Sequence, residues 1–329
     1  MNRSLRDGRG VIVVACLLVL ASVLVALPRG SGTAQGSREP TTARPAVIGV
    51  DGGSHWWEPR IERRQRALGA RYVRREFAGD LDHDVRFAQV RRTGQRTLCL
   101  MGGGERWRRD PDAYVRYVTN FARRYAKQCV AFEIVNEPYA RADGAQALYA
   151  RTYRRVVRAA RRVAPSARFL ISMEVGGEDG GPRGEDRWVD ALYDAVPDLN
   201  AYVDGVAVHL YGDDPVSCDA DKRWCFRRID RFRERLSEHG AADKPFWITE
   251  LGVPTGRCYE CVGEKRQAEW IGGYLEAVRA RTDVAAVFLY QLSDLRTGDW
   301  SSKEFNFGLL RSDGRRKPAY GVVRAAVSR

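Results

Sequence analysis

Short apolar segments alternate with amphipathic helical segments from residue 46 to the end of the chain. Eight of them have the length and composition of buried strands: Val47–Asp51, Tyr72–Phe77, Thr97–Met101, Val130–Asn136, Phe169–Val175, Val206–Tyr211, Phe246–Leu251 and Val284–Tyr290. A helical pattern follows each strand. Repeated βα units need right-handed crossovers and form a parallel sheet. Eight such units predict the α/β fold class, as a single (β/α)₈ TIM barrel.

The predicted helices cover Glu58–Leu68, Asp82–Arg92, the segment after Asp110-Pro111, Ala145–Val163, Trp188–Ala195, Arg227–His239, Glu264–Arg281 and Ala319–Ala326. Asp110 is a suitable N-cap, and proline fits the first helical position. Gly69 and Gly94 are placed to end the first two helices. A doubly wound open sheet is the alternative, but the turn at residues 51–57 lacks the G-x-G-x-x-G pattern of that fold.

The N-terminal region reads as a targeting segment. Three arginines precede the apolar run Val11–Leu27, whose length lies between a signal-peptide core and a spanning helix. Residues 1–28 are therefore predicted to be a cleaved signal peptide or an uncleaved membrane anchor. Residues 29–45 read as a flexible linker, and residues 46–329 as the catalytic barrel. Either outcome places the barrel outside the cytoplasm, secreted or membrane-anchored.

The chain has 55 Lys+Arg against 42 Asp+Glu, a net charge of +13, and only six of the basic residues are lysines. The composition is typical of a globular protein and excludes a disordered chain or a multi-pass membrane protein. No nucleic-acid-binding module is recognisable, so nucleic acid is not expected as a partner. The excess charge fits a surface that faces an anionic polymer or a membrane. We expect a monomer.

Two carboxylates lie at the ends of strands on opposite sides of the predicted barrel. Glu137 directly follows the fourth strand and Glu250 lies near the end of the seventh, so both should face one pocket. Cleavage of a glycosidic bond needs one proton donor and one anion. Ideal alternation puts Glu250 on the face of Phe246, and puts Glu137 and Asn136 on opposite faces. The fourth strand must therefore lose its regular pleat if Asn136 and Glu137 both meet a substrate.

The sequence resembles the retaining (β/α)₈ glycoside hydrolases of clan A, nearest to the cellulase-like family 5 and family 39. The matching stretches are Phe132–Pro138 (FEIVNEP), Val208–Tyr211 (VHLY) and Phe246–Gly252 (FWITELG). The resemblance implies hydrolysis of β-glycosidic bonds in oligo- or polysaccharides by double displacement, with no cofactor and no metal. The alternative is a catalytically weak or inactive carbohydrate-binding barrel at the cell surface.

By the same resemblance, Glu137 is the acid/base and Glu250 the nucleophile. Arg74 and Tyr211 are expected to support Glu250. Asn136 is expected to contact the sugar 2-hydroxyl and His209 to reach the mouth of the barrel. Arg74 or its neighbour Arg75 could instead pair with Glu76 or Glu133, and His209 could be a core histidine. The rival carboxylates near strand ends are Glu174, Asp51 and Asp294.

Aromatic faces stack on sugar rings, so aromatic residues in loops after strands are candidate platforms. These are Trp56, Trp57, Trp107 and Trp300, and Tyr290 at the end of the eighth strand is a further candidate. The chain departs from family 5 in two places. Residues 97–104 (TLCLMGGG) carry no histidine near the third strand, and Tyr290 stands where a tryptophan usually ends the eighth strand.

Six cysteines follow the apolar segment, and an even count outside the cytosol favours disulfides. Cys99 and Cys129 lie on or beside adjacent strands. Two further pairs lie in the loops after strands six and seven and could be joined within or between the loops: Cys218, Cys225, Cys258 and Cys261. Zinc on these four is the alternative.

Overall fold

The computed structural model describes residues 45–52, 58–78, 82–138, 145–173, 184–211, 226, 228–295 and 301–329. The predicted N-terminal segment and nearly all of the linker lie outside these ranges. So do several predicted site residues: Trp56, Trp57, Glu174, Cys218, Cys225 and Trp300. Among the described residues, no helix has the length and apolar content that a membrane span requires.

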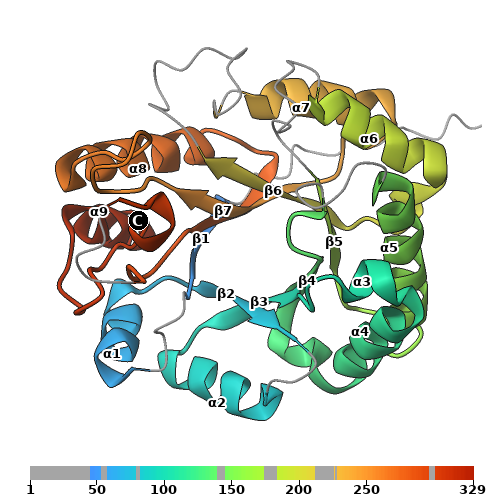
Figure 1. Ribbon diagram of the computed structural model, residues 1–329, viewed down its shortest axis with the longest axis horizontal. Coiled ribbons are helices and arrows are strands. Elements are labelled where there is room, and N and C mark those ends of the chain that lie inside the picture. The colour runs from blue at the N-terminus through green and yellow to red at the C-terminus, as the bar shows by residue number, and fades with distance from the viewer. Residues whose placement is uncertain are drawn as a thin grey trace, which may run out of the picture. The chain divides into compact units, whose positions relative to one another are not determined.

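Eight parallel strands form one closed barrel in chain order, and β8 pairs with β1 (Figure 1). The strands are β1 (Val47–Asp51), β2 (Tyr72–Phe77), β3 (Arg96–Met101), β4 (Cys129–Ile134), β5 (Phe169–Ser172), β6 (Gly205–Tyr211), β7 (Phe246–Gly252) and β8 (Val284–Leu289). The predicted (β/α)₈ fold is confirmed.

Helices surround the barrel (Figure 1). They are α1 (Pro59–Leu68), α2 (His83–Thr93), α3 (Arg106–Arg109), α4 (Pro111–Tyr125), α5 (Ala145–Arg161), α6 (Gly184–Ala195), α7 (Arg228–Glu238), α8 (Glu264–Arg279) and α9 (Pro318–Val327). Asp110 caps α4 by accepting a hydrogen bond of 2.9 Å from the Ala113 amide. Gly69 and Gly94 end α1 and α2 with φ of 80° and 74°, which explains why glycine stands there.

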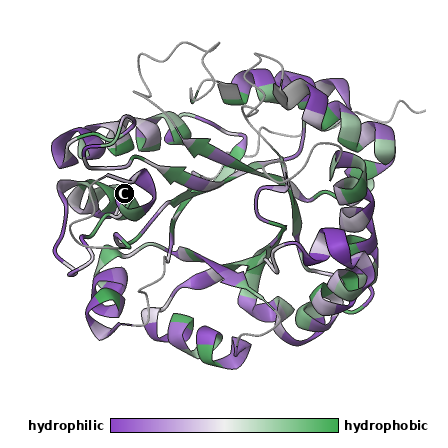
Figure 2. Cartoon of the chain, viewed as in Figure 1, coloured by the Kyte–Doolittle hydropathy of each residue, from purple (hydrophilic) through white to green (hydrophobic). Residues whose placement is uncertain are grey.

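Two apolar layers hold the fold together. The larger lies between the barrel and the helices, whose outer faces are polar (Figure 2). The smaller fills the barrel lumen, where Tyr72 stacks on Trp247 and Phe288 at ring-centroid distances of 6.4 and 6.3 Å. A side chain at Gly49 would approach the Phe288 ring to 2.6 Å, so this glycine makes room for the ring. Because the lumen is packed, a substrate has access only to the strand ends.

Several details differ from the predicted elements. β4 ends at Ile134, two residues earlier than expected, and β5 ends at Ser172 instead of Val175. The short helix α3 was not predicted. It buries Trp107, which is 1% exposed and packs against Tyr149 at a ring-centroid distance of 5.7 Å. The expectation that Trp107 is a sugar platform is therefore wrong.

Two disulfides join described cysteines. Cys99 and Cys129 link β3 to β4, with a Cα–Cα distance of 5.7 Å. Cys258 and Cys261 pair within the loop after β7. Pairing within this loop uses both sulfur atoms, so the zinc alternative fails for these two cysteines.

Candidate active site

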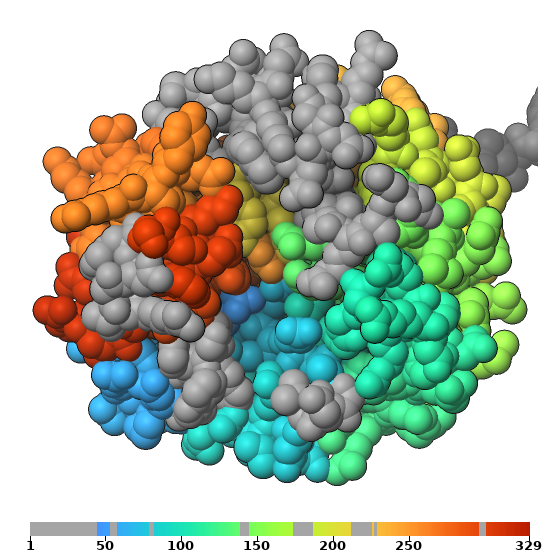
Figure 3. All heavy atoms as spheres, in the orientation of Figure 1, coloured from blue at the N-terminus to red at the C-terminus, as the bar shows by residue number. Residues whose placement is uncertain are grey.

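Polar side chains from several strands meet at the carboxyl ends of the barrel strands. Figure 3 shows a face of the molecule that is hollowed near its centre, where blue atoms from the N-terminal part of the barrel lie deep. The residues that contact one another there are Asp51, Arg74, Glu133, Asn136, Glu137, His209, Tyr211, Thr249 and Glu250. The site brings together the six described residues that the sequence placed around the two glutamates: Arg74, Asn136, Glu137, His209, Tyr211 and Glu250. Asp51, Glu133 and Thr249 join them.

The chain leaves the regular strand conformation directly after β4. Val135 and Glu137 have positive φ angles of 66° and 44°, a region that β-branched valine rarely adopts. Such backbone conformations cost about 1–3 kcal/mol each and cluster at functional sites. As a result Asn136 and Glu137 both face the mouth. The loss of pleat that the sequence argument required is therefore present.

β7 also departs from regular alternation, and here the simple prediction is wrong. Phe246 and Ile248 pack in the layer beneath the helices, so ideal alternation would send Glu250 there too. The pairing of β7 with β8 shifts register between Ile248 and Leu251, and its pairing with β6 shifts between Val208 and His209. Thr249 and Glu250 consequently both contact groups of the site. The irregular pairing turns Glu250 toward the mouth.

Two donors hold the carboxylate of Glu250. Arg74 donates from Nη1 to Oε1 at 2.6 Å, and the Tyr211 hydroxyl donates to Oε2. Glu250 is 7% exposed. Burial raises its pKa, and the charges of His209 and Arg74 oppose that rise. The two hydrogen bonds stabilise the ionised carboxylate in a position where it can act as an anion.

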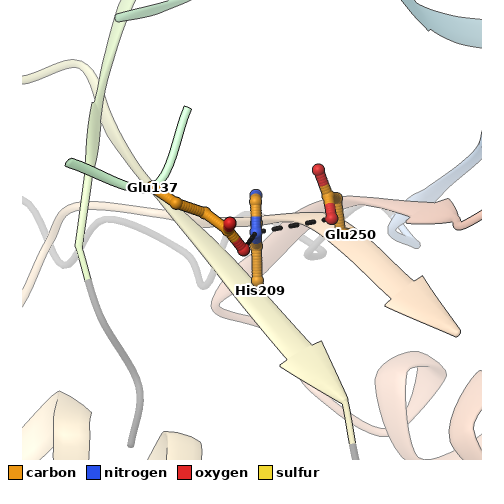
Figure 4. Close-up of side chains that lie close together, drawn as sticks. All are labelled: Glu137, His209 and Glu250. Atoms are coloured by element: carbon orange, nitrogen blue, oxygen red, sulfur yellow. Dashed lines mark hydrogen bonds and ion pairs between the residues drawn. The ribbon is translucent and has the colours of Figure 1, made fainter. Parts of the chain in front are cut away.

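His209 lies between the two glutamates (Figure 4). Its Nδ1 lies 2.7 Å from Oε1 of Glu137 and 3.5 Å from Oε2 of Glu250. One ligand atom from each of the three residues lies within 4.8 Å of the other two. The two carboxylates are therefore close enough to act on the same bond.

The surroundings of His209 favour its protonated form. Burial lowers its pKa, but Glu250, Glu133 and Glu137 outweigh that effect and raise it to about 10. In turn, burial would raise the pKa of Glu137, yet the hydrogen bond and the charge of His209 lower it. A divalent cation bound by Glu137, His209 and Glu250 would have to displace this proton. The arrangement is thus suited to hold and move a proton.

Arg74 is held by Glu133 of β4, which is fully buried. Nε and Nη2 of Arg74 donate to the two carboxylate oxygens at 2.7 and 3.0 Å. Thr249 also donates to Glu133 at 3.0 Å, and His209 Nε2 lies 3.6 Å away. Burial would raise the pKa of Glu133, but Arg74 and His209 lower it to about 2. Glu133 therefore orders the two cationic side chains that contact the glutamates.

Arg74 was expected either to support Glu250 or to form an ion pair with Glu76 or Glu133. It contacts Glu250 and also pairs with Glu133. It also contacts Asp51 at 3.0 Å and donates to the Asn136 side chain at 2.7 Å. Sequence reasoning gave Glu133 only as a partner for an arginine and missed Thr249. Position was the available signal for Glu133, since it precedes Glu137 by four residues on the strand that enters the mouth.

The remaining candidates fall in different places. Tyr290 lies beside the site and meets Tyr211 edge-on at a ring-centroid distance of 6.0 Å. Asp294 is buried and pairs with Lys317 at 2.8 Å, so it has a structural role. Arg75 is also buried, and its side chain occupies the space that a side chain at Gly52 would need.

No protein-family model and no curated protein matches the chain. Solved structures do. A family 39 glycoside hydrolase from the gut symbiont Bacteroides cellulosilyticus WH2 is 19% identical with a TM-score of 0.66, and the match covers 87% of this chain and 64% of that one. A GH5_18 structure from Streptomyces cattleya in complex with GlcNAc is 18% identical with a TM-score of 0.60, covering 88% and 81%.

The endo-beta-1,4-mannanase from Thermotoga petrophila is 15% identical with a TM-score of 0.57, and the match covers 86% of this chain and 76% of that one. At these identities the structural similarity shows the fold alone. The resemblance to clan A barrels that the sequence motifs indicated is therefore confirmed at the level of architecture. The chain spans less than two thirds of the family 39 structure.

Proposed function

We propose that this barrel is a retaining glycoside hydrolase that cleaves β-glycosidic bonds of oligo- or polysaccharides. The observation that carries the proposal is the pair Glu137 and Glu250, whose nearest ligand atoms lie within 4.8 Å across His209. Retaining enzymes need carboxyl groups roughly 5–5.5 Å apart, whereas inverting enzymes need roughly 6.5–9.5 Å to admit a water molecule. The short separation favours double displacement.

In the first step an oxygen of Glu250 attacks the anomeric carbon while the bond from that carbon to the leaving oxygen breaks. Arg74 and Tyr211 position the attacking carboxylate through the contacts described above. The leaving oxygen takes a proton from Glu137. The anomeric carbon is then bonded to Glu250 as an ester.

The proton for this step comes from His209. Before substrate binds, the proton resides on Nδ1 of His209, which lies 2.7 Å from Oε1 of Glu137. Transfer to Oε1 of Glu137 leaves neutral His209 and a protonated acid. The pair thus holds the proton together at a pH where an isolated glutamate would have lost it.

In the second step Glu137 accepts a proton from water, whose oxygen attacks the anomeric carbon. The ester bond breaks and Glu250 leaves as a carboxylate. Two inversions give a product with the original configuration. Asn136 is expected to bind the sugar 2-hydroxyl, and Tyr290, Trp56, Trp57 and Trp300 to contact the rest of the sugar.

We further infer that the protein acts outside the cytoplasm as a monomer. Disulfides persist in oxidising compartments, and Cys99–Cys129 and Cys258–Cys261 are both paired. Residues 1–28 would direct export and, if uncleaved, hold the barrel at the membrane.

The test is hydrolysis of a panel of aryl β-glycosides and β-glucans by the wild type, Glu250→Gln and Glu264→Gln. Glu264 pairs with Arg311 and forms no hydrogen bond or ion pair with the residues of the candidate active site, so it controls for loss of a carboxylate. We expect the wild type and the control to be active and Glu250→Gln to lose at least a thousandfold. Proton NMR should detect the β anomer as the first product.

An α anomer as the first product would contradict the retaining mechanism. Equal activity of Glu250→Gln and the wild type would contradict the role of Glu250. A wild type that binds oligosaccharides without cleaving any would favour the carbohydrate-binding barrel.

A further inference from the structure

A second pocket lies on the outside of the barrel, between α1 and the turn that precedes α9. Its volume is about 450 Å³. The residues that line it are Arg60, Arg63, Arg64, Ala67, Asp313, Gly314 and Arg315. It shares no residue with the candidate active site.

One face of α1 forms a wall of this pocket. The helix buries Ile61, Gln65 and Leu68 against the barrel. Its lining residues follow the spacing i, i+3, i+4 and i+7 from residue 60 to residue 67, so they form one continuous stripe. Three of these four positions are arginines, and the small side chain of Ala67 leaves space at the end of the stripe.

The turn at residues 313–315 forms the facing wall. Arg60 Nη1 donates to the Asp313 carbonyl at 3.2 Å and so ties the turn to α1. Gly314 has a φ of 81°, which favours glycine, and an added Cβ would lie 3.6 Å from Cδ of Arg60. The pocket is therefore a defined concavity with arginines on both walls.

The charges in this pocket are not balanced. Asp313 is the one acidic lining residue, and its carboxylate already accepts from the backbone amide and Nε of Arg315 at 2.9 and 2.6 Å. Arg60 pairs with Glu58 outside the lining. The side chains of Arg63 and Arg64 form no ion pair with any residue that the structure describes. Two guanidinium groups therefore remain available for an anion.

We propose that this pocket binds an oxyanion, a carboxylate, phosphate or sulfate group, carried by a glycan. Guanidinium groups donate two parallel hydrogen bonds to such groups, and a concave site encloses one of them. The lining has no aromatic side chain on which a nucleic-acid base could stack. The choice of a glycan as carrier rests on the proposed function, whereas the binding of the oxyanion does not. The pocket also accounts for part of the charge of +13.

The test uses fluorescein-labelled oligogalacturonate and a neutral oligosaccharide of equal length, followed by fluorescence anisotropy with the full chain at about 50 and 150 mM salt. The pocket variant is Arg63→Gln/Arg64→Gln. The matched control is Arg151→Gln/Arg158→Gln, which removes the same charge from the exposed face of α5. All four arginines are at least partly exposed, so we expect both variants to fold. Circular dichroism verifies this.

We expect the wild type to bind the anionic oligomer more tightly than the neutral one, and the pocket variant to bind the neutral oligomer as the wild type does. The pocket variant should raise Kd for the anionic oligomer at least about tenfold, and the control less than about twofold, because only the pocket variant loses the charged hydrogen bonds to the anion. Equal weakening in both variants would overturn the proposal, since it would reflect net charge alone. Binding to vesicles containing anionic lipid but not to the oligomer would overturn the glycan assignment. Binding needs no turnover, so failure here leaves the proposed hydrolase untouched.

Discussion

Replacing Glu133 by glutamine tests the buried network in depth. The variant keeps the shape of the side chain but removes the charge that faces Arg74, Thr249 and His209. The pKa of Glu133 falls from 4.5 to about 2 on folding. A lowered carboxyl pKa stabilises the fold above the unfolded value, and the contribution disappears as pH falls from 4.5 toward 2. The shift corresponds to about 3 kcal/mol at pH 7, of which about 2 kcal/mol is lost by pH 3.

The assay is urea unfolding of the wild type and Glu133→Gln at pH 7 and pH 3. At pH 7 we expect the variant to be less stable by about 3 kcal/mol, because one partner of a buried ion pair has been removed. At pH 3 the difference should shrink to about 1 kcal/mol. The control Glu264→Gln removes a partly exposed pair and should cost less than about 1 kcal/mol. A difference between wild type and Glu133→Gln that is the same at both pH values would refute the reasoning.

Two further predictions concern stability and pH dependence. Replacing Cys99 and Cys129 by alanine opens a bridge with a sequence separation of 30 and should lower the free energy of unfolding, measured with heat or urea, by about 3–4 kcal/mol. Removing the bridge between Cys258 and Cys261, with a separation of 3, should lower it clearly less, because a shorter loop is closed. The reverse order would contradict this prediction. Tyr211→Phe removes a donor from Glu250 and so raises the pKa of that carboxyl further. Its kcat should fall about 10- to 100-fold and the acidic limb of its kcat/KM profile should move to higher pH, and an unmoved acidic limb would show that the hydroxyl does not support the anion.

The architecture could be predicted because its signals are local. Strand and helix alternate in the sequence, Asp110 and Gly69 mark helix ends through their own chemistry, and eight βα units close only one way. The irregular end of β4 could also be inferred, because Asn136 and Glu137 are neighbours that cannot both face a substrate from a regular strand. That requirement is met by the positive φ angles at Val135 and Glu137.

The remaining features depend on tertiary contacts. Glu250 faces the mouth because β7 shifts register against its neighbours, and pairing between strands leaves no mark in the local pattern. Trp107 is buried because the unpredicted helix α3 turns it onto Tyr149. Glu133 reads as an ordinary strand residue until the fold brings Arg74 and His209 to it. The pocket of arginines likewise joins α1 to a turn about 250 residues later.

Identification of the residue that carries the sugar ester tests the central claim most directly. The protein is incubated with the 2-deoxy-2-fluoro analogue of the aryl glycoside that it cleaves best, which slows breakdown of the ester, and is then digested and sequenced by mass spectrometry. The account predicts one glycosyl adduct, on Glu250, and none in Glu250→Gln. An adduct on Glu137 or Asp51, or full hydrolysis of the substrate with no adduct on any carboxylate, would contradict it.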